Sequence, residues 1–207
     1  MKLEKIIVGP VGTNCYLLIN ENTKEVLVVD PGDQAQRIRN KMKETGAHPV
    51  AVLLTHGHFD HILGVSELKE LYSDLEVYAL EEEQDLLHDA SMNCSTQIGR
   101  PCTVRADHLV KDGEKLSIAG MNIEVIATPG HTKGSCWYYL PEEKALFSGD
   151  TLFAESVGRT DLPTGSMGQL SRSIKKLFAM LPDETDVYPG HEYATSIEHE
   201  KRYNPFA

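Results

Sequence analysis

The sequence predicts an α/β sandwich in which sheets lie inside and helices cover their outer faces. Two observations lead to this fold class. Short apolar stretches with strand character cluster within each half of the chain, and helical stretches lie between and after them. In addition, metal-capable side chains follow several of the expected strand ends, which indicates a site at the edge of a sheet. The length of 207 residues fits one domain, and we expect a single domain over 1–207.

The first half of the chain shows short strands separated by turn residues, followed by helical stretches. Residues 34–45 predict a helix because Ile38 and Met42 share one face and Gly46 can end it. The run over 50–54 is apolar throughout, which indicates a strand covered on both faces. We expect helices over 34–45 and 62–72, and strands over 6–8, 15–19, 25–29, 50–54 and 76–79.

The second half repeats this pattern. Ser166 and Gln169 form a capping box at the start of a helix that should run to about residue 180. The stretch over 89–107 has no periodicity; long irregular loops are often functional, and an ordinary surface connection fits equally well. We expect a brief terminal helix, and strands over 115–118, 123–127, 135–140, 145–148 and 187–188.

The composition excludes several classes of protein. A net charge of −11 argues against a nucleic-acid partner, because such proteins usually carry a basic face. No stretch has the length of a membrane span or the apolar core of a signal peptide, so we expect a cytoplasmic protein with no membrane partner. The four cysteines show no C-x-x-C pair, and free thiols are expected in a reducing compartment.

The most informative stretch is Thr-His-Gly-His-Phe-Asp-His, which follows the apolar run over 50–54. Its four metal-capable side chains are His56, His58, Asp60 and His61. Imidazole and carboxylate groups at this close spacing, just past a strand, are typical of a metal site.

Three further candidate ligands follow later strands, each beside a glycine that permits a tight turn. They are His131, Asp150 and His191. Taken alone, a histidine after Pro-Gly is more often a surface turn residue, and the aspartate is more often a turn or cap residue. Their joint presence beside the histidine cluster favours a shared metal centre.

This order of ligands at strand ends resembles the metallo-β-lactamase fold superfamily, over nearly the whole chain. Within the superfamily, the stretches over 12–16, 29–32, 149–153 and 158–161 resemble glyoxalase II and its small, single-domain bacterial relatives. The resemblance implies an αββα sandwich of two mixed sheets and a binuclear centre. His56, His58 and His131 would hold one metal ion, and Asp60, His61 and His191 the other, with Asp150 bridging them.

The ligand chemistry suits two divalent metal ions, most simply Zn²⁺, while similar ligands also accept Fe or Mn. A metal-bridging hydroxide would attack the carbonyl of a small thioester, and Asp60 would orient that hydroxide as well as bind metal. Asp30 is expected either to support a ligating imidazole or simply to end its strand.

The resemblance departs from glyoxalase II at the substrate. The chain ends 16 residues after His191, so we expect no C-terminal helical domain to grip glutathione. Arg159 and Asp161 stand where a lysine and a tyrosine would hold glutathione; Arg159 is expected either to clamp a carboxylate or to pair with Asp161. Asn93, in the irregular loop, is a further candidate substrate contact. The alternatives are a mononuclear-iron persulfide dioxygenase, whose family shares the 158–161 pattern, and a lactone or phosphodiester hydrolase.

Overall fold

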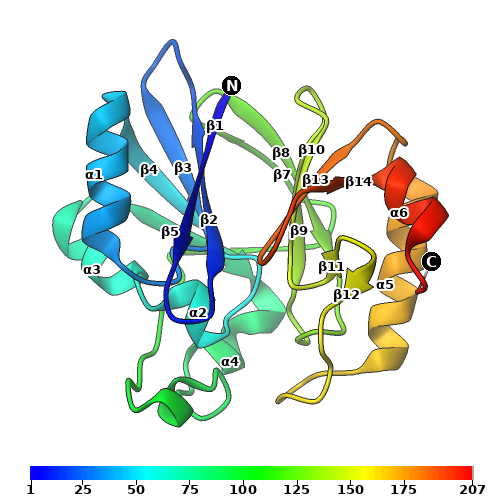
Figure 1. The fold of residues 1–207 in the computed structure, drawn as a ribbon. Coiled ribbons are helices and arrows are strands. Elements are labelled where there is room, and N and C mark those ends of the chain that lie inside the picture. Colours follow the sequence, from blue (N-terminus) through cyan, green and yellow to red (C-terminus); the bar gives the residue numbers. More distant parts are fainter. Residues whose placement is uncertain (207) are drawn as a thin grey trace.

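Two six-stranded sheets face each other in the middle of the molecule, and helices cover their outer faces (Figure 1). The structure is a computed structural model, and it describes residues 1–206. Both sheets mix parallel and antiparallel pairs. The predicted αββα sandwich of two mixed sheets is therefore confirmed.

The first sheet has the order β1-β2-β3-β4-β5-β6 and changes from antiparallel to parallel pairing at β3. A parallel neighbour requires a crossover, and the helices that follow β3 and β4 supply it on the outer face. The strands are β1 (Lys2–Val8), β2 (Thr13–Ile19), β3 (Glu25–Val29), β4 (His48–Leu53), β5 (Glu76–Leu80) and β6 (His108–Val110). The helices in this half are α1 (Ala35–Thr45), α2 (Phe59–Ile62), α3 (Val65–Leu71), α4 (Gln84–Leu87) and the 3-10 helices η1 (Glu81–Glu83) and η2 (Ser95–Ile98).

The second sheet has the order β14-β13-β10-β9-β8-β7, and only β10 and β13 pair in parallel. The strands are β7 (Lys115–Ile118), β8 (Met121–Ala127), β9 (Cys136–Leu140), β10 (Ala145–Gly149), β13 (Asp186–Pro189) and β14 (Thr195–Ser196). A small hairpin of β11 (Leu152–Phe153) and β12 (Ser156–Val157), and the helices α5 (Met167–Met180) and α6 (Ile197–Tyr203), complete this half.

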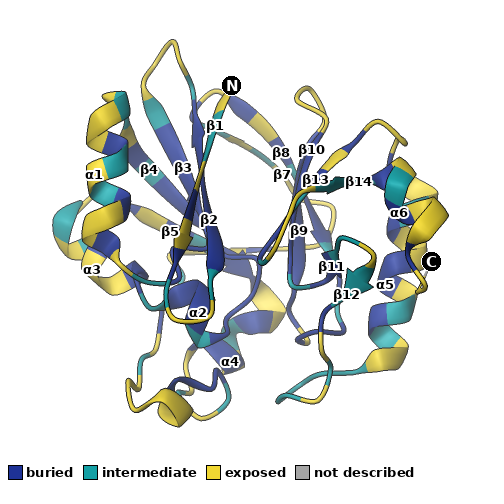
Figure 2. Ribbon diagram, in the orientation of Figure 1, coloured by how far each residue is buried: buried dark blue, intermediate teal, exposed yellow. Residues whose placement is uncertain are grey.

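The core has three layers, as expected where two sheets are each covered on both faces. Burial is continuous through the central strands and alternates along the helices (Figure 2). Tyr138 belongs to the middle layer, where its hydroxyl donates to Leu54 O at 3.1 Å across the two sheets. This contact ties β9 to the end of β4, directly before the histidine cluster.

Several expectations need correction. The helix expected over 62–72 is shorter: α3 covers Val65–Leu71, and Ile62 is the last residue of the separate helix α2, because the backbone breaks at Leu63 and Gly64. The Cβ that a side chain would add at Gly64 would lie 2.7 Å from Pro31 O, so the break packs tightly on the turn after β3. The irregular loop contains η2, and β6, β11, β12, β14, η1 and α4 were not predicted. Ser166 caps the start of α5 as predicted, since Gln169 N donates to Ser166 Oγ, but the capping box is only half formed, because Ser166 N donates to Gly130 O instead of to the Gln169 side chain.

The cysteines Cys15, Cys94, Cys102 and Cys136 are free thiols, as predicted. Across residues 1–206, no helix combines the length and the apolar character that crossing a membrane would need.

Candidate metal centre

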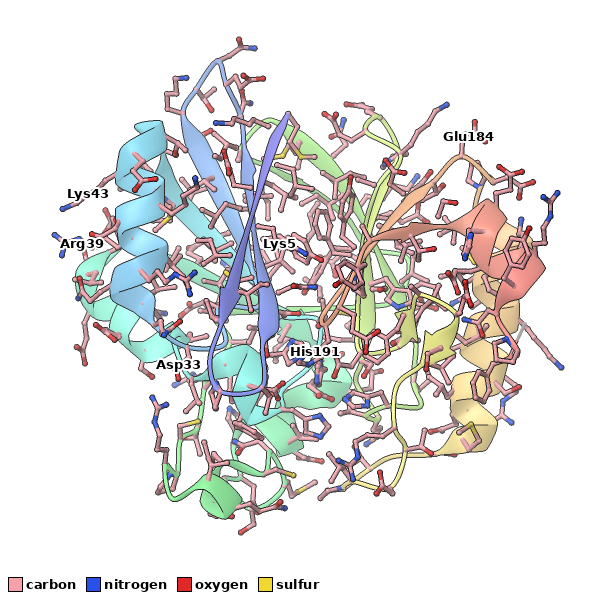
Figure 3. All side chains as sticks on the ribbon, viewed as in Figure 1. Lys5, Asp33, Arg39, Lys43, Glu184 and His191 are labelled. Atoms are coloured by element: carbon pink, nitrogen blue, oxygen red, sulfur yellow. The ribbon has the colours of Figure 1, made fainter. Side chains whose placement is uncertain are left out.

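The seven candidate ligands converge at one edge of the sandwich, where loops from both sheets meet. The loop after β4 and helix α2 carry four of them; the others follow β8, β10 and β13. His191 lies in the gap between the sheets, at the edge where these loops gather (Figure 3). Ligand atoms lie within 4.8 Å of one another in three overlapping groups: His56, His58 and His131; His56, His61 and Asp150; Asp60, His61 and His191.

The first group consists of three imidazoles whose nitrogens face one another. His58 Nδ1 lies 2.9 Å from His131 Nε2, which lies 3.2 Å from His56 Nε2. Burial, reinforced by the neighbouring imidazoles, lowers the pKa of His58 to about 3 and holds the pKa of His56 well below its usual range. Neutral imidazoles that direct lone pairs at one point are the donors that a divalent cation prefers.

The group of Asp60, His61 and His191 combines imidazoles with a carboxylate. His191 Nε2 lies 3.2 Å from Asp60 Oδ2, and His61 Nε2 lies 3.5 Å from the same oxygen. Burial lowers the pKa of His191, but hydrogen bonds to Asp150 and Asp60 outweigh it and raise that pKa to about 9. A cation here would displace the proton and take its place between the charges.

Asp150 lies between this group and the three-histidine group. Its Oδ1 is 3.3 Å from His61 Nε2, and its Oδ2 is 3.4 Å from His191 Nε2 and 3.7 Å from His131 Nε2. Burial raises the pKa of Asp150, yet the nearby imidazoles overcome it and hold the pKa well below its ordinary value. The Asp150 carboxylate therefore contacts imidazoles of both groups.

Unsatisfied buried atoms show that this cluster fits metal ions. Within residues 1–206, His61 Nε2 and Asp150 Oδ1 are buried and lie 3.3 Å apart, yet neither makes a well-directed hydrogen bond to the other or to any other atom. Buried polar atoms are rarely left without a partner, because their desolvation costs free energy. Both atoms point into the cluster, and a cation held between the groups would satisfy them.

Asp30 contacts a candidate ligand, His61, on the side of the imidazole ring that faces away from the other ligands. This contact matches the expectation that Asp30 supports a ligating imidazole. Its Oδ2 accepts from His61 Nδ1 at 2.9 Å, and this fixes the tautomer that leaves Nε2 free. The same oxygen accepts from Thr55 Oγ1 at 2.6 Å, and Oδ1 accepts from Thr55 N at 2.8 Å. Asp30 thus joins the end of β3 to the start of the ligand loop.

Other supporting residues lie in stretches that carry the family resemblance, but the sequence assigned them no contact with the ligands. Thr13 Oγ1 donates to Asp60 Oδ2 at 3.1 Å, and Asn14 Nδ2 donates to Pro189 O at 3.0 Å beside the His191 turn. His131 Nδ1 donates to Arg159 O at 2.8 Å. These contacts depend on distant parts of the chain coming together, so only the folded structure reveals them.

A cavity of about 1040 Å³ opens over the centre. Its floor includes His58, Asp60, His131, Asp150 and His191. Its walls are largely apolar with two cationic side chains, and they include Lys5, Ile7, Val11, Phe59, Phe153, Arg159, Leu162 and Tyr193. The space suits a small molecule whose reacting group reaches the floor.

The two candidate substrate contacts have different outcomes. Arg159 lines the cavity, and it also forms the ion pair that was offered as an alternative, with Nε 2.7 Å from Asp161 Oδ1. Asn93 does not reach the cavity wall: it is fully buried, its amide donates to Cys102 O, and its Oδ1 accepts from Ser95 N. The proposal of Asn93 as a substrate contact is therefore corrected, because its polar atoms hold the loop together.

Residues 8–191 match the family model of the metallo-β-lactamase superfamily. This chain belongs to that superfamily. It is 39% identical to the probable metallo-hydrolase YqgX of Bacillus subtilis, over 100% of this chain and 97% of the relative. It is 33% identical to the hydroxyacylglutathione hydrolase GloC of Haemophilus influenzae, over 100% of this chain and 98% of the relative.

Solved structures of the superfamily share this fold closely. The crystal structure of BLEG-1, a B3 metallo-β-lactamase, matches with a TM-score of 0.93 and 40% identity, over 99% of both chains. The structure of TTHA1623 in a di-iron-bound form matches with a TM-score of 0.88 and 34% identity, over 99% of this chain and 100% of the other. The chain is thus a hydrolase of the metallo-β-lactamase superfamily, with a cluster of histidines and aspartates suited to divalent metal ions.

Proposed function

We propose that this superfamily member is a binuclear metallohydrolase that cleaves a small thioester, as the glyoxalase II group does. The observation that carries the proposal is the convergence of seven histidine and aspartate side chains, five of which line the floor of one cavity. The similarity to GloC, a hydroxyacylglutathione hydrolase, over the whole chain supports the substrate class.

The ligand set divides into two sites that share one carboxylate. His56, His58 and His131 would hold one cation, Asp60, His61 and His191 would hold the second, and Asp150 would contact both. Two bound divalent cations, Zn²⁺ or Fe, would supply Lewis-acid stabilisation of the developing oxyanion and a water of lowered pKa. The di-iron form of TTHA1623 supports iron as an alternative to zinc.

The chain's own residues place the reactants. Asp60 lines the cavity and is steadied by Thr13, so it is positioned to orient the attacking water toward the thioester carbon. Hydrolysis gives a carboxylic acid and a thiol; a thiol pKa of about 8.5 means that the leaving thiolate needs little help from a general acid. The largely apolar walls would exclude bulk water from the carbonyl.

Two cationic side chains of the cavity wall offer partners for an anionic substrate, although the wall also carries Glu192. Lys5 and Arg159 line the cavity, and a substrate carboxylate could replace the exposed Asp161 as the partner of Arg159. We expect Arg159→Ala to raise the KM for an anionic thioester while leaving kcat within about threefold, because loss of uniform binding affects KM alone. An unchanged KM would remove Arg159 from the substrate site.

The direct test is hydrolysis of S-D-lactoylglutathione, followed by loss of the thioester absorbance after reconstitution with Zn²⁺ or Fe²⁺. We expect turnover by the wild type and none by Asp150→Ala. A suitable control is Asp183→Ala, which alters an exposed carboxylate paired with Lys201 and should retain full turnover. Hydrolysis that survives in Asp150→Ala would disprove the bridging role.

β-Lactam hydrolysis is the second candidate, favoured by the 40% identity to BLEG-1. A chromogenic cephalosporin tested on the same preparations separates the two activities, and we expect the thioester to have the higher kcat/KM. Oxygen uptake with glutathione persulfide tests the dioxygenase alternative, and we expect none. Metal analysis should find close to two ions per chain for the hydrolase and close to one iron for the dioxygenase.

A further inference from the structure

A buried glutamate joins the two loops that carry the three-histidine group. Glu83 ends η1, directly after β5, and only 1% of its surface is exposed. These two loops come from different sheets: the loop with His56 and His58 follows β4, and the loop with His131 follows β8. A carboxylate in such a place needs partners, because an unpaired buried charge is strongly unfavourable.

Both carboxylate oxygens of Glu83 are used, and each serves a different loop. Oε1 accepts from Gly57 N at 2.8 Å, between His56 and His58. Oε2 accepts from Thr132 Oγ1 at 3.0 Å and from Gly134 N at 2.9 Å, directly after His131. One side chain thus bonds to the chain beside every histidine of the first group.

The backbone around Glu83 packs closely against the same two loops. A Cβ on Gly134 would lie 2.3 Å from Glu83 N, and a Cβ on Gly57 would lie 2.8 Å from Leu86 Cδ2 in α4. At Gly134 the neighbour is backbone, so any larger residue would push η1 away from the loop; at Gly57 the neighbours are leucine side-chain ends. The segment over 81–87 therefore fits both loops at once.

We propose that Glu83 is a positioning residue for the three-histidine metal site, holding the loops of the two sheets at the separation that brings His56, His58 and His131 together. This inference rests on the ligand set proposed above. It is specific to one site, because the hydrogen bonds of Glu83 within residues 1–206 reach neither Asp60 nor His61. Asp30 and Thr13 support those two ligands instead.

The energetics separate this role from a merely structural one. Burial raises the pKa of Glu83 to about 7, although its three hydrogen bonds pull the pKa down. A carboxyl group with a raised pKa costs folding free energy when it is ionised. Replacing it with the neutral, equally sized glutamine removes that cost and also removes some of the bonds, so we expect little net change in the stability of the metal-free fold near neutral pH.

The test is a calorimetric titration of the metal-free protein with Zn²⁺, comparing Glu83→Gln with Glu82→Gln. Glu82 is the exposed neighbour in the same 3-10 helix and provides the matched control. In Glu83→Gln we expect one of the two sites to weaken about 10- to 100-fold, the usual effect of losing a residue that supports a metal ligand. The other site and the unfolding temperature of the metal-free protein should match those of Glu82→Gln.

Unchanged affinity at both sites, or equal weakening of both, would overturn the proposal. If Glu83→Gln does not fold, Thr132→Val removes a single bond to Glu83 and should weaken the same site by a smaller factor; wild-type affinity in that variant would overturn the proposal too. His131→Ala separates the two levels of inference. If it loses one site while Glu83→Gln keeps both, only the role of Glu83 is wrong; if His131→Ala also keeps both, the ligand set itself is wrong.

Discussion

Replacing Asp30 with asparagine should weaken metal binding without touching a ligand. Asp30 Oδ2 accepts from both His61 Nδ1 and Thr55 Oγ1. An amide nitrogen in its place would present a donor to His61 Nδ1, which would then accept and leave the proton on Nε2. Nε2 is the atom that faces Asp150 and Asp60, so the proton would block it as a ligand.

The size of the effect follows from the contact that is lost. A hydrogen bond to a charged group contributes about 1.5–3 kcal/mol. If that free energy is what keeps His61 in the ligating tautomer, its loss weakens metal binding by about 10- to 100-fold. Thr55 also loses an acceptor, so the metal-free protein should be less stable by a further 1–3 kcal/mol, roughly the cost of one unsatisfied buried donor.

The assay is a competitive Zn²⁺ titration against a chromophoric chelator, with urea unfolding of the metal-free protein alongside. The matched control is Asp33→Asn, which alters a nearby carboxylate bound to Arg100 at the surface. Its zinc affinity should be that of the wild type, and its stability should fall by no more than about 1 kcal/mol. Wild-type zinc affinity in Asp30→Asn would refute the tautomer argument.

Three further predictions address the centre, the sandwich and the pH response. In Gly190→Ala the new Cβ would lie 2.3 Å from Asp150 Oδ1, so metal analysis should find fewer than two ions per chain in a protein with an unaltered circular dichroism spectrum; full loading would contradict this. Tyr138→Phe removes the bond to Leu54 O and should lower the free energy of unfolding in urea by about 1 kcal/mol, with thioester turnover retained. Because burial raises the pKa of Glu83 from 4.5 to about 7, its contribution to the stability of the metal-free protein is fully present below pH 4.5 and is lost as the pH rises through about 7. The loss should be about 3 kcal/mol, and Glu83→Gln should remove this part of the pH dependence of urea unfolding; an unchanged pH profile would show that Glu83 does not titrate in this range.

Elements with strong local signals could be predicted from the sequence. The strand over 25–29 and the helix that ends at Gly46 match β3 and α1 because apolar pattern and turn residues agree there. By contrast, β6 has three residues, one of them the exposed Leu109, and forms only because it pairs in parallel with β5. Such short edge strands depend on tertiary pairing and leave no periodicity to detect.

The site shows the same division. The ligands could be predicted because histidines and aspartates follow several strand ends at close spacing and in a recognisable order. Glu83 could not, since it lies in a run of three glutamates that has the composition of a solvated turn. Asn93 was misjudged because an asparagine in an irregular loop can serve a ligand or its own turn, and here its amide closes the turn around Ser95.

The most direct test of the account is thioester turnover measured against metal loading in a single titration. Metal-free protein should be inactive toward S-D-lactoylglutathione, and activity should rise as Zn²⁺ or Fe²⁺ is added and reach its plateau at two ions per chain. A protein that binds both ions yet hydrolyses no thioester, or one that is fully active without metal, would contradict the proposed function.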